Sequence, residues 1–304
     1  MRRVLLFPIF FLIVAASAAA LYFAERRSKA SHVSASAVVE LAADAQRDVT
    51  RIPMRLTRIS DQEEIAIGTK LSAQYAARDQ VLTPEQGALQ LYVSRVGAAV
   101  AVHAQRHLPY EFHFLPDRNL VNAFALPGGH IYIGQGMTDL MLTEDELASV
   151  LAHEVEHVDH YHCVERFQLE AKLKRVDLQV VGTLLQLPLS IWEAGYHKDE
   201  ELEADREGML LAVQAGYSPY GALKMFERFA QLHQEYVIQA RTPEEEMSHL
   251  AIESLQGYFR THPLPSERIE QANRLIAEQR WQVRTKQRPF HFEYEVHNGQ
   301  LIRR

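Results

Sequence analysis

The segment HEVEH at positions 153–157 is the part of this sequence whose residue types and spacing could most directly do chemistry. Residues four apart on a helix share one face, so His153 and His157 can present two imidazoles to one metal ion. Glu154 would then lie beside the metal, placed to take a proton from a bound water. The pattern therefore predicts a zinc hydrolase that still lacks one protein ligand. Since the chain has 15 histidines, the surroundings must separate this motif from a chance match.

The helix that this motif requires is indicated by the residues around it. Residues 143–146 read TEDE and fit a capping box, in which Thr143 and Glu146 each accept a hydrogen bond from the other's backbone amide. Apolar residues then follow at helical spacing, namely Leu147, Val150, Leu151, Val155 and Val158. A helix starting at Thr143 and continuing through the motif is predicted.

A third ligand is expected because catalytic zinc commonly takes three protein ligands and keeps a fourth position for water. The segment ELEAD at 201–205 supplies two glutamates, and helical geometry separates them. The face of Glu201 continues through small residues, which allows close approach to another helix, whereas the face of Glu203 is mostly charged. Glu201 is thus favoured, with Glu203 as the alternative. Asp205, one turn on, is placed to accept a hydrogen bond from the far nitrogen of a ligating histidine.

The plainer interpretation of residues 200–207 is a charged, solvated helix face. Taken alone, this segment would favour that interpretation. Beside an H-E-x-x-H helix and a stripe of small residues, a ligand helix is favoured instead.

The composition of the chain narrows the class of protein and the kind of metal site that it can form. The 304 residues are 47% apolar and 23% charged, which is typical of a globular protein. The net charge of −7 argues against general nucleic-acid binding. Cys163 is the single cysteine, so no intrachain disulfide and no cysteine-rich zinc site can form, and any metal must be held by histidine and carboxylate. A buried thiol is favoured over a reactive one.

The N-terminus predicts export. Arg2 and Arg3 precede an uncharged apolar run over residues 4–23, about the length that spans a bilayer. A signal anchor is favoured. A cleaved signal peptide is the alternative, since residues 16–18 read ASA, an A-x-A-like cleavage site.

The chain divides into four predicted segments. Residues 1–27 are the anchor or signal peptide, 28–60 a tether and helical lead-in, 61–280 the main domain, and 281–304 a short extension. Within the main domain we expect a strand at 110–115 and two extended runs within 121–133, joined by the turn Pro127-Gly128-Gly129. The predicted class is α+β, mainly helical.

Five ordered motifs together resemble the membrane-linked gluzincin peptidases, a family that includes the CAAX prenyl endopeptidase, the HtpX heat-shock peptidase and BepA. The resemblance covers roughly residues 63–277. The motifs are NAFALPGGHIYI at 122–133, the helix at 147–162, ELEAD at 201–205, AGYSP at 215–219 and THPLPSERI at 261–269. The last block is similar to the BepA-like branch, here without that branch's C-terminal helical repeats. The resemblance implies a zincin-type metallopeptidase domain with a small antiparallel sheet.

The resemblance also implies site residues. One Zn²⁺ per chain is expected on His153, His157 and Glu201, with Glu154 as general base. Asp205 is expected to accept a hydrogen bond from the histidine nitrogen that faces away from the metal. The segment Asn122, Ala123, Phe124 and Ala125 is expected to be an edge strand that pairs with an extended substrate. His262 is expected either to occupy the open zinc position and hold the enzyme latent, or to be a structural histidine.

The predicted function is a zinc-dependent endopeptidase that acts on unfolded or misassembled membrane or envelope proteins. The implied role is protein quality control in the bacterial envelope. The expected location is the inner membrane facing the periplasm, or the periplasm itself if the N-terminal segment is cleaved. The alternative is an exported, zinc-containing, chaperone-like binding protein with little protease activity.

Overall fold

The structure is a computed structural model that describes residues 59–76, 82–173, 196–239, 265–281, 294–297 and 300–303. All of them belong to the second of two compact units, residues 58–304. The predicted N-terminal anchor, nearly all of the tether and His262 lie outside the described residues. Among the helices of the described ranges, none combines the length and apolar character that crossing a bilayer requires.

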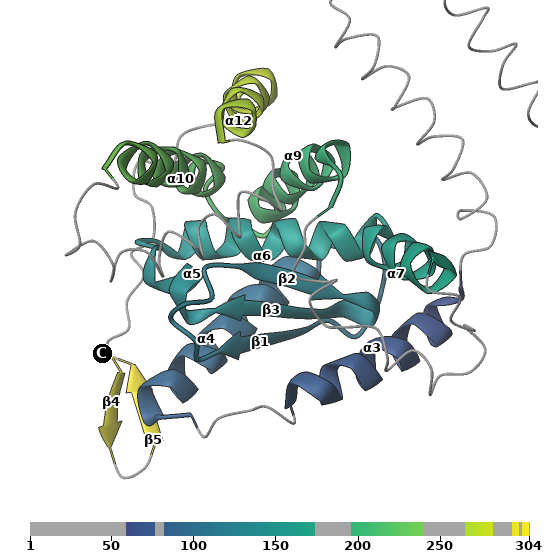
Figure 1. Ribbon diagram of the computed structural model, residues 1–304. Helices are drawn as coiled ribbons and strands as arrows, with labels where there is room; N and C mark the ends of the chain where they lie inside the picture. Colours follow the sequence, from purple (N-terminus) through teal and green to yellow (C-terminus); the bar gives the residue numbers. More distant parts are fainter. Residues whose placement is uncertain are drawn as a thin grey trace, which may run out of the picture. The chain divides into compact units, whose positions relative to one another are not determined.

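A three-stranded sheet lies in the middle of the domain, with helices above and below it (Figure 1). Its strands are β1 (Glu111–Leu115), β2 (Ala123–Leu126) and β3 (His130–Gly134), in the spatial order β1-β3-β2. β2 pairs antiparallel with β3, but β1 pairs parallel with β3, so the expected antiparallel sheet is a mixed one. The reason is the path of the chain, which leaves β1, runs to the far edge as β2 and returns through the middle as β3.

The tight turn between β2 and β3 is the predicted Pro-Gly-Gly turn, a short 3₁₀ segment at Pro127–Gly129 (η1). Gly128 and Gly129 have φ angles of 81° and 96°, a region that strongly favours glycine. Helix α3 (Asp61–Ala76) packs against this turn, and the Glu64 carboxylate accepts a hydrogen bond from the Gly128 amide at 3.0 Å. The hairpin is therefore anchored from outside the sheet.

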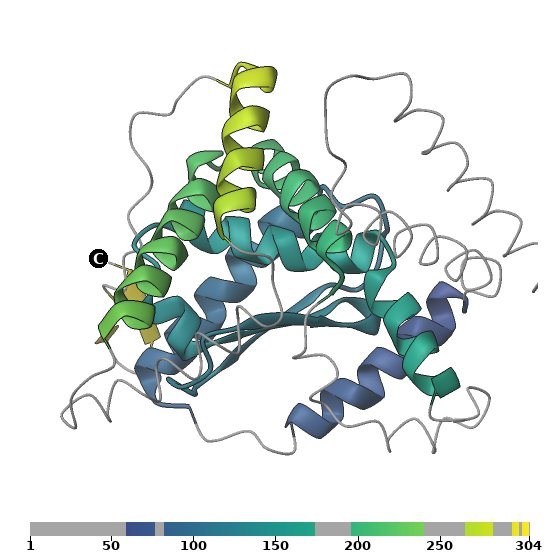
Figure 2. The same ribbon diagram turned by 45° about the horizontal axis from the view of Figure 1, so that its top comes forward.

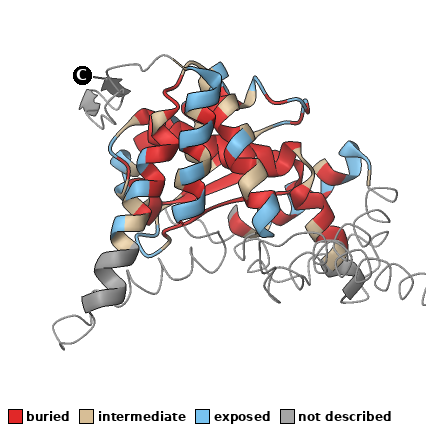
Figure 3. Ribbon diagram, turned by 90° about the horizontal axis from the view of Figure 1, so that it is seen from above, coloured by how far each residue is buried: buried red, intermediate tan, exposed pale blue. Residues whose placement is uncertain are grey.

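Helix α6 (Glu144–Asp159) carries the HEVEH segment and begins as predicted. The Thr143 hydroxyl accepts from the Glu146 amide at 3.2 Å, and the Glu146 carboxylate accepts from the Thr143 amide at 3.2 Å. Figure 3 shows α6 buried along nearly its whole length. A helix this buried must be enclosed on several sides by other elements.

The sheet and the helices α4 (Pro84–Ala101), α9 (Lys198–Gln214) and α10 (Tyr220–Gln239) provide most of that enclosure, and a further helix is α12 (Pro265–Gln279). α4, α9 and α10 contact α6 directly, and α12 bridges α9 and α10 (Figure 2). The other described elements are α5 (Gln135–Asp139), α7 (His162–Leu173) and a separate antiparallel pair, β4 (Tyr294–His297) with β5 (Gln300–Arg303).

The two faces of the sheet have separate apolar cores. Ile131 and Ile133 of β3 belong to the larger core, together with α6 residues such as Leu151. Tyr132 and Phe124 belong to a smaller core with residues of α3 and α7. This division follows from the period of two along a strand, which sends alternate side chains to opposite faces.

Helices α6 and α9 approach each other closely, as the stripe of small residues predicts. Ala204, Gly208 and Ala212 are all buried on α9. A Cβ atom at Gly208 would lie 2.9 Å from the backbone nitrogen of His153. No side chain fits between the helices at that point, so this glycine sets how near Glu201 comes to the histidines of α6.

We predict that Gly208→Ala destabilises the protein by about 1–3 kcal/mol, because the added methyl must push α9 away from the backbone of α6. Gly87→Ala is the matched control, since a Cβ at Gly87 in α4 meets nothing within 4 Å. That change should be neutral or stabilising by about 0.5–1 kcal/mol, since alanine favours the helix over glycine. Urea unfolding of both variants checks this. Equal stability of the two would contradict the packing argument.

Candidate metal centre

The three predicted zinc ligands converge in the interior. His153 and His157 project from α6, and Glu201 lies in the first turn of α9. The two Nε2 atoms are 3.1 Å apart. Glu201 Oε2 lies 3.4 Å from Nε2 of His153, and Glu201 Oε1 lies 3.7 Å from Nε2 of His157. Both His157 and Glu201 are fully buried, and His153 nearly so.

This spacing fits a zinc ion. Tetrahedral zinc with bonds of about 2.0–2.2 Å places neighbouring ligand atoms about 3.3–3.6 Å apart. The three measured separations of 3.1, 3.4 and 3.7 Å bracket that range. Two imidazole nitrogens and one carboxylate oxygen are also a donor set that suits zinc. The residues present could therefore hold the metal without rearrangement of the helices.

The far nitrogen of His153 is oriented by Asp205, whose Oδ1 lies 2.9 Å from Nδ1. Burial by itself would lower the pKa of His153, but the contacts with Asp205 and Glu201 outweigh it and raise that pKa to about 10. The carboxylates thus make this position strongly attractive to positive charge, which is what a bound cation requires. Asp205 occupies the place that the sequence predicted for it.

Asp205 is held in turn by Arg268 of α12, a contact that no pattern in the sequence predicted. The guanidinium donates through Nε to Oδ2 at 2.7 Å and through a second nitrogen to Oδ1 at 2.5 Å, a paired arrangement. Arg268 is buried and lies over the Phe226 ring, with Cζ 4.3 Å from its centre. Burial would raise the pKa of Asp205, but Arg268 and His153 more than offset this and lower it.

The far nitrogen of His157 has a different partner, the Nδ1 atom of His162 at 3.0 Å. His162 Nε2 lies 3.4 Å from Oε2 of Glu203. The hydrogen bond with His162 is the largest cause that lowers the pKa of Glu203, to about 2, so this carboxylate remains charged. Glu203, the weaker candidate for third ligand, therefore lies outside the three-atom cluster and orients His162.

Tyr196 also supports the centre, and nothing in the motif spacing pointed to it. Its backbone amide donates to Glu201 Oε1 at 3.0 Å. Its ring stacks on His157, with centres 3.8 Å apart and planes 18° apart. Its hydroxyl lies 2.9 Å from Sγ of Cys163, whose thiol pKa is raised by burial. Cys163 is thus the buried thiol that was expected.

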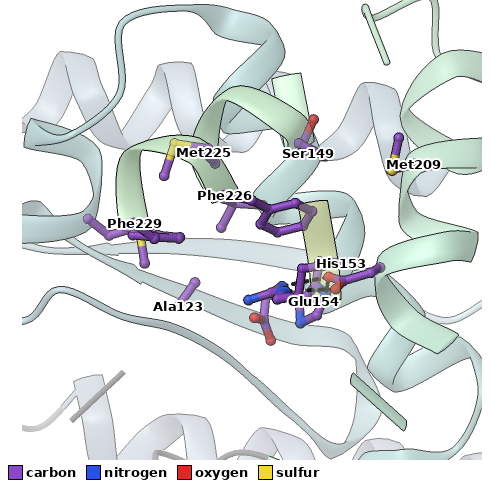
Figure 4. A pocket seen from close by; sticks show the side chains of 13 residues that line it. Ala123, Ser149, His153, Glu154, Met209, Met225, Phe226 and Phe229 are labelled. Carbon is purple, nitrogen blue, oxygen red and sulfur yellow. Dashed lines mark hydrogen bonds and ion pairs between the residues drawn. The ribbon is translucent and has the colours of Figure 1, made fainter. Parts of the chain in front are cut away.

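Glu154 lines a pocket together with His153, one of the three converging residues (Figure 4). Burial raises the pKa of Glu154 to about 7, which suits a group that accepts and returns a proton near neutral pH. Most of the other lining residues are apolar and come from β2, α5, α9 and α10: Ala123, Met137, Met209, Ala222, Met225, Phe226 and Phe229. Ser149 and Val150 of α6 and the Asp205–Arg268 pair complete the lining. Such a lining suits an apolar side chain beside the candidate centre.

The predicted edge segment does form an edge strand, β2, with Asn122 just before it. Ala123 lines the pocket, whereas Phe124 faces the other side of the sheet and stacks on Tyr132 at 5.1 Å. The outer edge at Ala125 is approached by Cys163, whose Sγ lies 3.7 Å from the Ala125 carbonyl oxygen. The part of the strand nearest the pocket is therefore its beginning, at Asn122 and Ala123.

A mainly helical domain with this mixed sheet and an H-E-x-x-H helix is of the zincin metallopeptidase type. Residues 85–276 match Peptidase family M48, and the chain belongs to that family. This confirms the resemblance drawn from the five motifs. The matched range lies inside the predicted 61–280 domain, whose own boundaries remain a prediction.

Named relatives agree with the family. The chain is 28% identical over 199 residues to a putative beta-barrel assembly-enhancing protease of Vibrio cholerae, covering 60% of this chain and 38% of that protein. It is 32% identical over 155 residues to the mitochondrial metalloendopeptidase OMA1 of Schizosaccharomyces pombe, covering 48% of this chain and 46% of that one. The chain thus spans less than half the length of these relatives.

We predict that Arg268→Gln weakens zinc binding about 10–100-fold, because Asp205 then loses the partner that holds it against His153. Arg274→Gln on the same helix is the control, since Arg274 is largely exposed and pairs only loosely with Glu270 at 3.7 Å. Competition with a chelator measures both affinities. Unfolding of both variants in excess chelator separates lost metal affinity from lost stability. Equal zinc affinity in the two variants would refute the role given to Arg268.

Proposed function

We propose that this protein is a zinc-dependent endopeptidase. The observation that carries the proposal is the convergence of His153, His157 and Glu201 at zinc-ligand spacing, with Glu154 lining the same pocket as His153. Membership of Peptidase family M48 supports it. One of these relatives is named a protease and the other a metalloendopeptidase, which is consistent with the same chemistry here.

In the proposed reaction, His153, His157 and Glu201 hold one zinc ion. Zinc, when bound, lowers the pKa of a coordinated water from about 15.7 to about 7 and polarises the scissile carbonyl. Glu154 takes a proton from the attacking water and later delivers it to the leaving amine. Burial raises the pKa of Glu154, which helps this carboxyl to hold the proton between the two steps.

Asp205 and His162 keep the two imidazoles in the orientation that presents Nε2 to the centre. These contacts reach the histidines from the side away from the reacting atoms. Their role is therefore to position the ligands while Glu154 moves the proton.

The substrate is proposed to be an extended polypeptide. An apolar residue next to the scissile bond would enter the pocket lined by Met209, Phe226 and Phe229. The beginning of β2, at Asn122 and Ala123, would pair with the substrate backbone by strand addition. Such pairing requires a locally unfolded chain, so unfolded or misassembled envelope proteins are the proposed substrates, and quality control the proposed role. The name of the Vibrio cholerae relative, a putative beta-barrel assembly-enhancing protease, is in line with an envelope protein as substrate.

The location proposed for the protein rests on its sequence alone. The apolar run at residues 4–23, outside the described residues, would anchor it in the inner membrane with the domain in the periplasm. If the segment were cleaved, the domain would be periplasmic and unanchored.

We predict that Glu154→Gln retains zinc but reduces peptide hydrolysis about 10²–10⁴-fold, since the proton acceptor is lost while the ligands remain. Glu156→Gln is the matched control, because it makes the same change two residues away on α6, at a buried carboxylate that contacts His160 at 3.2 Å. Casein cleavage and zinc content check both variants. If wild type and Glu154→Gln were equally inactive yet equally prevented aggregation of an unfolded protein, the chaperone-like alternative would replace the peptidase.

Latency is a separate part of the proposal. His262, outside the described residues, is proposed to fill the position that the catalytic water needs. We predict that His262→Ala raises the basal rate of casein cleavage, because the water position is then open. His107→Ala, at an exposed histidine, is the control. An unchanged rate in His262→Ala would leave His262 as a structural residue.

A further inference from the structure

A second cluster of metal-ligating side chains lies on the sheet, formed by Glu111 and His113 of β1 and His130 of β3. Nε2 of His113 lies 3.4 Å from Nδ1 of His130. Oε2 of Glu111 lies 3.4 Å from Nδ1 of His130 and 3.7 Å from Nε2 of His113. Two imidazole nitrogens and one carboxylate oxygen therefore converge a second time in this domain.

The register of the sheet creates this cluster. β1 and β3 run parallel with Glu111 opposite His130 and His113 opposite Tyr132. Residues two apart on a strand share a face, so all three side chains project to the same side. That side carries Tyr132 and Phe124 and packs against α3, whereas α6 packs on the other side. The cluster thus lies on the opposite face of the sheet from the α6 core.

The side chains are held in place by packing. The His113 ring stacks on Tyr132, with centres 4.5 Å apart and planes 18° apart. The Tyr132 hydroxyl lies 2.7 Å from that of Ser72 on α3. His130 is buried next to Gly68 of α3, where a Cβ atom would lie 3.2 Å from its ring. Only Glu111 is largely exposed, with 58% of its side chain accessible, so the cluster is open to solvent at that point.

We propose that Glu111, His113 and His130 form a second divalent-cation site, suited to zinc and separate from the candidate catalytic centre. Its separations of 3.4, 3.4 and 3.7 Å nearly repeat those among His153, His157 and Glu201. Both sets lie close to the spacing of about 3.3–3.6 Å expected between ligands of tetrahedral zinc. The same donor types at the same spacing predict the same kind of ion.

The role of this site is structural. Its ligands join β1, an edge strand, to β3, the central strand, and β3 in turn pairs with β2. A cation bound here stabilises the folded domain, because the unfolded chain does not bring these side chains together. It also holds the register of the sheet whose other edge lies beside the candidate catalytic centre.

Zinc stoichiometry of the full chain tests the proposal. The protein is stripped with a chelator, titrated with zinc, and the bound metal is counted by mass spectrometry. Wild type is expected to bind two zinc ions per chain. Glu111→Gln and His113→Gln should each bind one, and His107→Gln, which changes an exposed histidine outside the cluster, should still bind two.

Glu201→Ala distinguishes the two sites. This variant should also retain one zinc ion, and added zinc should raise its melting temperature. The double variant Glu201→Ala with His113→Gln should bind no zinc ion, and added zinc should no longer raise its melting temperature. The proposal is overturned if wild type binds a single ion that Glu201→Ala removes, a result that leaves the catalytic assignment intact. It is also overturned if the second ion persists in both Glu111→Gln and His113→Gln.

Discussion

The close packing of α9 on α6 is the constraint on which the candidate centre depends. Glu201 reaches the two histidines only because Gly208 lets the backbones of the two helices come together at His153. Burying a carboxylate and two imidazoles is costly unless each polar atom has a partner. A metal ion between them would satisfy all three at once. The chemistry of the site therefore depends directly on how closely the two helices pack.

Two sets of contacts from outside the centre complete it. Arg268 of α12 holds Asp205 against His153, while Glu203 holds His162 against His157. α12 thereby contributes to the metal centre although none of its residues reaches the converging atoms. The family match continues to residue 276, within α12, which agrees with that helix being part of the domain.

The sheet serves the site in a different way on each of its faces. The face toward α6 builds the larger core and supports the active-site helix, and the beginning of β2 borders the pocket. The opposite face packs on α3 and carries the Glu111, His113 and His130 cluster. A cation there would act through the stability of the sheet, whereas the ion at α6 would act on the substrate.

The sequence alone predicted those features that depend only on residues close together in the chain. The Thr143 cap, the Pro-Gly-Gly turn and the choice of Glu201 over Glu203 all depend on residues within a few turns of one another. The mixed sheet, the Arg268–Asp205 pair and the stacking of Tyr196 on His157 join segments far apart in the chain, and only the tertiary structure decides them. The His157–His162 contact is near in sequence, yet it depends on Tyr161 adopting a φ of 64°, which residue spacing does not reveal.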